Sequence, residues 1–259
     1  MTTLGNYELK AQIAQGGFAR IYQASHRFLD EPACIKHTRI AGKEYNDLLL
    51  QEAKILWQLN EHHSIPHSKD YFPLPDGSSA MVMDYIDGKP LDEFLPKGKR
   101  MHSEDASWIM ERLLSALHYA HYKGVIHGDL KPSQVLIEPK KHDIKLIDFG
   151  LSVVKPTSGT KPLGYTEAYV SPEVIEGKTP LPQTDLYGAG VVFMYALGGD
   201  VARKTLPADV PEPLAEFCMS LLRYDPIKRP SWEKENLLDK FSDLREQAFG
   251  RRHSSARRK

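Results

Sequence analysis

Residues 125–150 read VIHGDLKPSQVLIEPKKHDIKLIDFG, and two aspartates in this stretch each follow a short apolar run. Asp129 comes shortly after Val125-Ile126, and Asp148 ends the alternating run that starts at Ile144. Apolar runs of this kind predict short strands, so both carboxylates are expected where a strand ends. The stretch therefore offers two acidic side chains that strands hold in place.

A lysine and a glutamate that can pair with each other lie nearer the N-terminus. Ala33-Cys34-Ile35-Lys36 predicts a short buried strand, and a buried ammonium group needs a carboxylate or a bound anion as its partner. Between Lys43 and Leu59 the apolar residues repeat at the spacing of one helix face: Leu48, Leu49, Leu56 and Leu59. Glu52 lies on the same face, so we predict a Lys36–Glu52 ion pair.

Together these side chains supply the groups that phosphoryl transfer requires. Asp129 can accept a proton from a hydroxyl group, Asp148 can hold Mg²⁺, and Lys131 beside Asp129 can neutralise phosphate charge. The stretch Ala14-Gln15-Gly16-Gly17-Phe18-Ala19, between two predicted strands, would let backbone N–H groups approach phosphates closely. Taken alone, that stretch is explained better as a simple hairpin turn.

The pattern of elements changes along the chain. Tyr7 to about Tyr85 predicts short strands with one embedded helix, and the pairs Gly16-Gly17 and Asp76-Gly77 mark turns of an antiparallel sheet. The segment Pro90 to Gly98, rich in Pro, Gly and Lys, is a candidate boundary. Beyond it, amphipathic windows predict helices over residues 103–122, 186–197, 213–224 and 232–248.

Local signals refine this second part. Ser103 is the expected N-cap of its first helix, and Gly124 the expected stop. Short strands are predicted over Val135–Ile137 and Ile144–Ile147. Ser152 to Thr166 predicts a long loop, and loops of that length inside a domain are usually functional.

The overall composition limits the class of protein. The 259 residues are 41% apolar and 26% charged, with 34 basic and 34 acidic side chains, which is typical of a folded globular protein and disfavours charge-driven DNA binding. Cys34 and Cys218 lie far apart without metal-binding spacing, so a reducing, cytoplasmic setting is expected. The N-terminus lacks the apolar core of a signal peptide, and no membrane-spanning run occurs. The basic ending GRRHSSARRK predicts a solvated tail rather than a nucleic-acid or membrane patch.

Further stretches resemble motifs of one family. Ser171-Pro172-Glu173 resembles the Ala-Pro-Glu that closes a kinase activation segment, and Asp185 to Gly190 resembles its Asp-x-Trp-x-x-Gly helix start. Arg229-Pro230 resembles the late arginine that pairs with that glutamate. With the earlier motifs in family order, the chain resembles a eukaryotic-type (Hanks-type) serine/threonine protein kinase from about Tyr7 to about Phe249.

This resemblance implies an α+β, bilobal, protein-kinase-like fold. It has an antiparallel-sheet small lobe and a helical large lobe, with ATP between them. We expect the N-terminal lobe over residues 1–86, the C-terminal helical lobe over 87–249 and a basic, disordered tail over 250–259.

The resemblance also assigns catalytic roles. It implies that Asp129 is the catalytic base and that Lys131 contacts the γ-phosphate. Lys36 would bind the α- and β-phosphates, held by Glu52. Protein substrates of unknown identity would supply the acceptor hydroxyl groups.

Ligand-binding roles follow in the same way. Asp148 would be the main ligand of Mg²⁺ (or Mn²⁺), and Gln134 stands where the family has an asparagine that binds a second ion. ATP would contact the glycine-rich loop, the hinge with gatekeeper Met83, and the residues that enclose adenine: Ile13, Ala14, Gly16, Gly17, Phe18, Ala19, Ile21, Cys34, Lys36, Met83, Asp84, Ile86 and Leu136. Of the hinge residues, the backbone of Asp84 and Ile86 would face adenine.

Some positions depart from the family pattern. Ala14 and Ala19 replace the first and third glycines of the loop, which stiffens it. Gly128 replaces the arginine before the catalytic aspartate, and Cys34 replaces a smaller alanine. Gln134 is one methylene longer than asparagine, so we expect activity to depend strongly on the identity and concentration of the metal ion.

Two main interpretations remain open. The first is a kinase that transfers the γ-phosphoryl group of ATP to serine or threonine, because Lys131 and Thr166 match serine/threonine rather than tyrosine kinases. The alternative is a nucleotide-binding pseudokinase that acts as a scaffold, which Gln134 and the altered loop favour and the retained lysine and aspartates disfavour. An enzyme that phosphorylates small molecules fits the activation segment less well.

Two expectations concern phosphorylation of the chain itself. Without an arginine at position 128, the loop Ser152–Thr166 has lost the usual receptor of a regulatory phosphate, so activity should not require its phosphorylation. Arg251-Arg252-His253-Ser254 resembles a target of kinases that read basic residues. The acidic positions that such kinases use are uncharged here, at Pro90, Ser133 and Tyr195, so Ser254 is not expected to be a preferred autophosphorylation site.

Overall fold

The structure is a computed structural model that describes residues 2–96 and 98–252. It divides into two units by their internal contacts. The first unit comprises Met1–Asp87 with Asp148–Gly150, and the second comprises Gly88–Ile147 with Leu151–Lys259. The segment that carries Asp148 therefore belongs with the N-terminal part of the chain.

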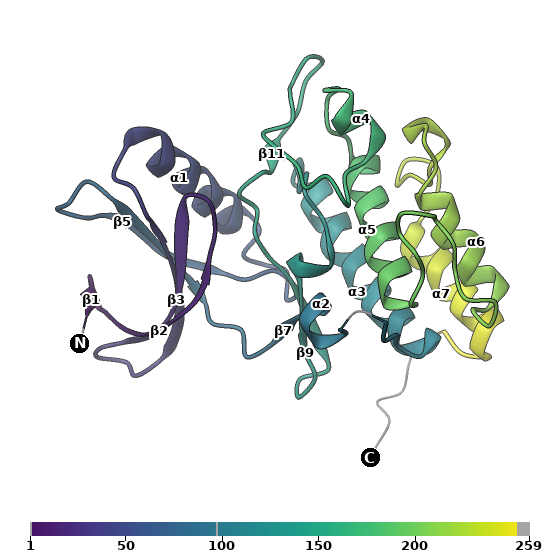
Figure 1. Cartoon of the computed structure of the whole chain (residues 1–259), viewed down its shortest axis with the longest axis horizontal. Helices are drawn as coiled ribbons and strands as arrows, with labels where there is room; N and C mark the ends of the chain where they lie inside the picture. The colour runs from purple at the N-terminus through teal and green to yellow at the C-terminus, as the bar shows by residue number, and fades with distance from the viewer. Residues whose placement is uncertain (1, 97, 253–259) are drawn as a thin grey trace. The chain divides into compact units, whose positions relative to one another are not determined.

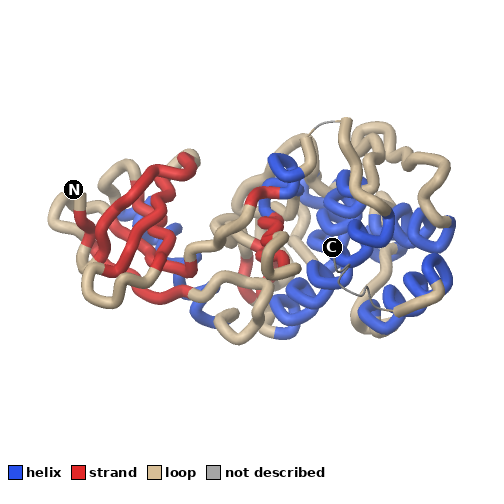
Figure 2. Tube along the Cα trace, turned by 90° about the horizontal axis from the view of Figure 1, so that it is seen from below, coloured by secondary structure: helices blue, strands red, loops and turns tan. Residues whose placement is uncertain are grey.

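The first unit is an antiparallel sheet with helix α1 (Lys43–Gln58) (Figures 1 and 2). Its strand order is β1-β2-β3-β4-β6-β5, with the bounds β1 (Thr3–Leu4), β2 (Tyr7–Gln15), β3 (Ala19–His26), β4 (Pro32–Thr38), β5 (Ser68–Pro73) and β6 (Ser79–Asp84). Ala33 and Ile35 of β4 are buried in the apolar cluster of the sheet, so Cys34 and Lys36 alternate onto the opposite face. The strand thereby presents a core side and a functional side.

Helix α1 buries the face that the leucine spacing predicts. Leu49, Leu56 and Leu59 are fully buried, whereas Leu48 is half-buried. Glu52 is only 1% exposed, so its carboxylate lies on the buried side of the helix as expected. Burial of a carboxylate at this level requires a nearby cation.

The second unit is mainly helical, with two small sheets. The sheets have the order β10-β9-β7 and β11-β8, with the bounds β7 (Lys89–Pro90), β8 (Val125–Ile126), β9 (Val135–Glu138), β10 (Asp143–Leu146) and β11 (Val153–Val154). The helices are α2 (Leu91–Phe94), α3 (Ser103–Tyr122), α4 (Pro172–Ile175), α5 (Pro182–Ala196), α6 (Glu212–Leu221) and α7 (Leu237–Phe249), with 3₁₀ turns η1 (Pro132–Gln134) and η2 (Pro226–Lys228).

Helix α5 is the centre of this unit, and most of its residues are buried. It packs against both α3 and α6, as Figure 1 lets the reader follow. A Cβ atom on Gly190 would lie 2.8 Å from that of Leu221, so the glycine lets α6 approach closely. An apolar helix surrounded by other helices is the expected arrangement of a large-lobe core.

Several helix ends differ from those that periodicity predicts. The N-cap of α3 is His102 rather than Ser103, because the His102 ring accepts a hydrogen bond from the Glu104 amide. Helix α5 starts four residues earlier than expected, at Pro182, which supplies the favoured first-turn proline. Helix α7 starts five residues later than expected, because Asn236 caps it. Capping is local chemistry that the apolar repeat does not contain.

The end of the chain is only partly described. Gly250 ends α7 in the left-handed conformation, with a φ of 70°. Arg251 Nε donates to Glu104 at 2.7 Å, and Arg252 pairs with Asp243. The rest of the predicted tail, residues 253–259 with Ser254, lies outside the described residues. Within the described ranges, no helix has both the length and the apolar character needed to cross a membrane.

A buried ion pair joins α4 to the segment before α7. Arg229 Nη1 and Nη2 donate to the two carboxylate oxygens of Glu173 at 2.7 and 2.8 Å, which confirms the pair expected from the motifs. The two side chains are 0% and 3% exposed. Burial acts to raise the pKa of Glu173, but the hydrogen bonds and charge of Arg229 outweigh it and hold that pKa below its usual value.

Replacing Glu173 by Gln should lower the free energy of unfolding by about 3 kcal/mol near neutral pH, because a buried guanidinium loses its carboxylate. Since the folded-state pKa of Glu173 is depressed, its contribution is present above the usual value of 4.5 and is lost as the pH falls through the folded-state pKa. Urea unfolding across this range should show the wild type and Glu173→Gln converging. Glu176→Gln, which removes an exposed partner of Lys178, is the control and should have little effect. If the difference in the free energy of unfolding between the wild type and Glu173→Gln does not change with pH, the pKa of Glu173 is not depressed by folding.

Candidate functional site

The first unit holds a cluster of three charged side chains. Lys36 Nζ donates to Glu52 Oε2 at 2.7 Å, to Glu52 Oε1 at 3.0 Å and to Asp148 Oδ1 at 2.9 Å, so the predicted Lys36–Glu52 ion pair is present. Burial acts to lower the pKa of Lys36, but the two carboxylates outweigh it and raise that pKa above its usual value. The ammonium group therefore stays charged at neutral pH.

Strand register explains what surrounds this lysine. Lys36 lies opposite Ile21 on β3 and Met81 on β6, and Cys34 lies opposite Met83. Cys34 is 8% exposed, and burial raises the pKa of its thiol to about 12. The thiol therefore acts as an apolar group beside the lysine rather than as a nucleophile.

The β2–β3 turn, residues 16–18, is held by a residue that the sequence analysis missed. Gly16 N donates to Ala19 O at 2.8 Å, which closes the turn. Arg39, directly after β4, donates its backbone N–H to Phe18 O at 2.8 Å and its guanidinium to Gly16 O and Gly17 O at 3.2 and 3.4 Å. No pattern in the sequence pairs Arg39 with this turn.

Phe18 connects the same turn to the charged cluster. Its ring centroid lies 5.4 Å from Lys36 Nζ and 6.4 Å from the ring of Tyr45 on α1, with the two rings stacked. The turn thus covers the lysine through an aromatic side chain. The remaining residues predicted to contact nucleotide in this unit lie on β2, β3, β6 and just beyond it: Ile13, Ala14, Ala19, Ile21, Met83, Asp84 and Ile86.

Asp84 is already engaged within the first unit. Its backbone N–H donates to His67 O at 3.1 Å, and its carboxylate accepts from His67 N and Lys69 Nζ at 3.0 and 3.2 Å. The carbonyl group of Asp84, rather than its N–H, is therefore the backbone group that can face a ligand.

The second unit holds Asp129 and Lys131 together with Thr166. Lys131 Nζ donates to Asp129 Oδ2 and to Thr166 Oγ1, both at 2.6 Å. Thr166 donates its N–H to Asp129 Oδ1 at 2.9 Å and its hydroxyl to Oδ2 at 3.1 Å. Both oxygens of the carboxylate are thus oriented. The sequence pointed to Thr166 only as a marker of class, not as a direct partner of Asp129.

A buried carboxylate positions the loop that carries Asp129. Asp185 on α5 accepts from the backbone N–H groups of His127 and Gly128, at 2.8 and 2.9 Å, and its Oδ2 lies 2.8 Å from His121 Nε2. Trp232 Nε1 donates to His121 Nδ1 at 2.9 Å. An indole N–H can only donate, so His121 Nδ1 accepts and Nε2 carries the proton given to Asp185. Sequence reasoning missed His121 and Trp232.

The backbone conformation at position 128 favours glycine. Its φ is 85°, and a Cβ atom there would lie 2.9 Å from Leu151 O. An arginine at this position would be strained and would displace the neighbouring backbone. The structure thus explains the missing arginine of the family pattern.

The two predicted metal ligands belong to different units. Asp148 lies in the first unit with a φ of 64°, and Gln134 is buried on η1 in the second. Among the described residues, no group of three or more His, Cys, Asp or Glu side chains could hold a metal ion. A carboxylate and an amide oxygen suit Mg²⁺, which usually takes one or two protein ligands and completes its shell with phosphate oxygens and water. Leu136, on β9, also belongs to the second unit.

Replacing Trp232 by Phe should remove the hydrogen bond to His121 and keep an aromatic ring. We expect a loss of about 1 kcal/mol in the free energy of unfolding. Amide hydrogen exchange should accelerate at His127 and Gly128, because their acceptor Asp185 is held less firmly. Trp57→Phe, on the exposed side of α1, is the control. If the two amides exchange at the wild-type rate in the Trp232→Phe variant, Trp232 does not help to position Asp185 through His121.

Comparison with known proteins agrees with this geometry. Residues 7–205 match the protein kinase domain family. The chain is 30% identical over 206 residues to serine/threonine-protein kinase pkn3 of Myxococcus xanthus, a match that covers 74% of this chain and 38% of that protein. It is 32% identical over 214 residues to serine/threonine-protein kinase D of Synechocystis, covering 75% and 41%. It is 30% identical over 224 residues to serine/threonine-protein kinase PrkC of Bacillus subtilis, covering 80% and 34%.

The chain therefore spans well under half the length of these relatives. The family match nevertheless runs from the start of β2 to beyond α5 and includes both charged clusters. Membership of this family implies the use of ATP and a divalent cation. On this basis, the chain belongs to the protein kinase domain family.

Proposed function

We propose that the chain transfers the γ-phosphoryl group of ATP to serine or threonine hydroxyl groups of protein substrates. The observation that carries this proposal is the hydrogen-bond network of Asp129, Lys131 and Thr166. In it, the lysine and the threonine both bind the Asp129 carboxylate and orient it. Relatives named serine/threonine-protein kinases support the same class of acceptor. We further propose that the two units are the lobes expected over residues 1–86 and 87–249, and that the protein is cytoplasmic, since Cys34 and Cys218 are both free.

In the proposed reaction, the substrate hydroxyl oxygen forms a bond to the γ-phosphorus while the bond to the β–γ bridging oxygen breaks. The hydroxyl proton passes to Asp129, and ADP leaves with the bridging oxygen. Thr166 and Lys131 orient the Asp129 carboxylate, so its proton-accepting oxygen is positioned before the substrate arrives. Lys131 also places positive charge where the transferred group becomes more negative.

Lys36 and the β2–β3 turn would hold the phosphates of ATP. Arg39 binds the carbonyl oxygens of Gly16 and Gly17. Because each peptide unit is planar and trans, the N–H groups of Gly17 and Phe18 point away from Arg39. These N–H groups can therefore serve a phosphate, which offsets the loss of two glycines in the loop. The adenine would lie against Ile21, Cys34 and Leu136.

The divalent cation would neutralise phosphate charge when bound. Asp148 and Gln134 would hold it, and both supply the oxygen ligands that Mg²⁺ or Mn²⁺ accepts. Gln134 is held by its backbone, since its N–H donates to Lys131 O and its carbonyl accepts from Ile147 N, both at 2.9 Å. Because these bonds fix the backbone, it cannot shift to compensate for the extra methylene group of the glutamine side chain.

A nucleotide-binding scaffold without catalysis is the alternative, and Gln134 with the alanines at 14 and 19 is all that favours it. The retained Lys36, Asp129 and Asp148 favour catalysis. Incubating the purified chain with labelled ATP, a protein substrate and Mg²⁺ or Mn²⁺, with Asp148→Ala as control, distinguishes the two. Transfer that the control lacks supports the kinase, and ATP binding without transfer supports the scaffold.

Lys36→Met should abolish measurable transfer, a loss of at least about 10²-fold, because the phosphates lose their cation. The substitution also removes the cation that lies beside the buried Glu52 carboxylate, which destabilises the fold. The double variant Lys36→Met/Glu52→Gln removes both charges and should restore stability but not activity. Lys10→Met, on the exposed part of β2, is the matched control. Wild-type turnover in the folded double variant would refute the role of Lys36.

Replacing Thr157, Ser158 and Thr160 together by Ala should leave activity within about tenfold of wild type, since the loss is at most an uncharged hydrogen bond or two. Gly128 provides no receptor for a loop phosphate. The bonds that hold the loop include the uncharged one from Gly159 N to Thr179 Oγ1 at 3.1 Å. Thr166→Ala, which removes a direct partner of Asp129, should reduce the initial rate much further. A collapse in the triple variant would show that loop phosphorylation matters.

Gln134→Asn should raise the initial rate at low Mg²⁺, because it restores the usual ligand length. If weaker binding of the second metal ion raises the activation free energy by about 1.4 kcal/mol, transfer becomes roughly tenfold slower. Mn²⁺ should partly compensate in the wild type. The measurement is initial rate against metal concentration for both proteins. Identical curves would show that Gln134 is already an adequate ligand.

A further inference from the structure

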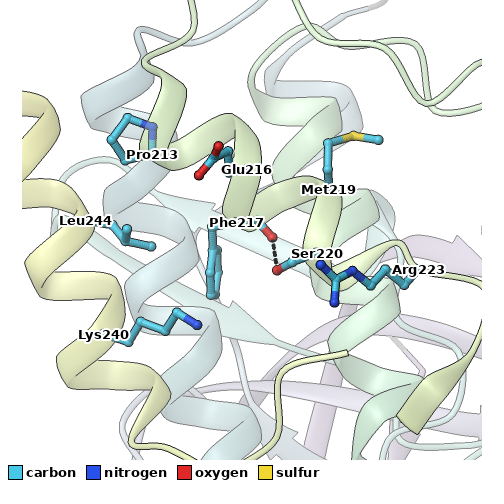
Figure 3. A pocket seen from close by; sticks show the side chains of 8 residues that line it. All are labelled: Pro213, Glu216, Phe217, Met219, Ser220, Arg223, Lys240 and Leu244. Atoms are coloured by element: carbon cyan, nitrogen blue, oxygen red, sulfur yellow. Dashed lines mark hydrogen bonds between the residues drawn. The ribbon is translucent and has the colours of Figure 1, made fainter. Parts of the chain in front are cut away.

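A groove follows helices α6 and α7 in the second unit, and no part of the proposed reaction uses it. One hollow, of about 510 Å³, has Phe217 and Leu244 in its lining, with Glu216 and Lys240 beside them (Figure 3). A second hollow, of about 400 Å³, shares Ser220, Arg223 and Lys240 with the first. We call the two together the α6–α7 groove.

The second hollow concentrates positive charge that the protein does not neutralise. Arg223 Nη1 donates to Lys228 O at 2.8 Å and Lys234 Nζ to Ile227 O at 3.0 Å, so both bind neutral carbonyl groups. No carboxylate among the described residues pairs with Arg223, Lys228 or Lys234. Three like charges around one hollow repel one another unless an anion lies between them. The whole chain has zero formal net charge, so this concentration is local.

The rest of the groove has a different character. Lys240 is paired with Glu235 at 2.8 Å and contributes little net charge. Phe217, Met219 and Leu244 give the first hollow an apolar lining, and Met219 is 39% exposed. Glu216, on the same hollow, has no partner among the described residues. The groove thus runs from a cationic end to an apolar end bordered by one carboxylate.

We propose that the α6–α7 groove binds an acidic segment of another protein. The carboxylates of that segment face Arg223, Lys228 and Lys234, and an apolar side chain next to them sits in the first hollow, which Met219 and Leu244 line. Glu216 repels acids at the apolar end, so it fixes the direction in which the segment lies. Binding of this kind needs neither ATP nor catalysis.

Charge favours an acidic protein segment in the groove over two other occupants, the basic end of the chain itself and a nucleic acid. The chain's own last ten residues, GRRHSSARRK, carry five basic side chains and no acid, so they do not complement the cationic end. A nucleic acid would place phosphates along the whole groove, where they would meet Glu216 and an apolar lining that offers phosphates nothing. A short acidic and apolar segment fits both halves.

The test is fluorescence anisotropy without ATP, using the labelled peptide Leu-Phe-Gly-Asp-Glu-Asp-Glu. Two matched peptides replace either the acids by Asn and Gln or the Leu-Phe pair by Gly-Gly. We expect the first peptide to bind most tightly and to weaken as NaCl is raised. The double variant Lys228→Glu/Lys234→Glu should bind it about tenfold or more weakly, and Arg203→Glu, exposed elsewhere on the unit, should bind as wild type.

Several outcomes would overturn the proposal. These are no binding of the acidic peptide, equal binding of all three peptides, or equal binding by the charge-reversed variant. A single-stranded oligonucleotide that binds the groove as tightly as the peptide, and loses affinity in the same variant, would identify a nucleic-acid site instead. The charge-reversed variant and the Arg203→Glu control should both keep wild-type kinase activity on a short substrate peptide. Failure of the groove proposal and failure of the kinase assignment therefore give different results.

Discussion

The site in the second unit depends on one buried carboxylate. Asp185 accepts two backbone N–H groups of the loop that carries Asp129, and His121 donates to it with its own tautomer set by Trp232. Burying a carboxylate until it is 1% exposed is costly unless hydrogen-bond donors of this kind surround it. The donors to Asp185 come from α3 and the loop, and Trp232, in the segment before α7, donates to His121. Packing of the helices therefore helps to place Asp129. These bonds hold the backbone of His127 and Gly128 next to Asp129.

The other buried charges follow the same rule with different consequences. Glu173 and Arg229 are paired inside one unit and cross-link it, a structural role with no free group left for chemistry. Lys36 is shared between Glu52 and Asp148, and Asp148 is much more exposed than either partner. A shared lysine can exchange one partner for a phosphate at small cost, because its charge is never left alone. The Glu173–Arg229 pair therefore stabilises the fold, whereas the shared Lys36 can bind a ligand.

Charge at the surface behaves differently. The α6–α7 groove holds Arg223 and Lys234, which bind carbonyl oxygens, whereas other exposed cations, such as Lys178 and Arg252, have a carboxylate within reach. Exposed pairs contribute little to stability, so their absence costs the fold little. An uncompensated cluster can therefore persist where it serves recognition. The groove lies on helices that the catalytic residues do not occupy, so binding of the proposed segment would be able to vary independently of the chemistry.

The sequence by itself determined the family, the strand-rich and helix-rich parts and the Lys36–Glu52 pair, and it assigned separate roles to Asp129 and Lys131. These were readable because their motifs are short and contiguous, and because apolar repeats report directly on burial. The tertiary structure alone decided the roles of Arg39, His121 and Trp232, since each acts through a partner far away in the chain and belongs to no periodic pattern. It also decided the helix ends at His102 and Asn236, which depend on local capping bonds. Gly128 is the clearest case: the sequence shows that arginine is absent, and only its φ of 85° beside Leu151 O gives the reason.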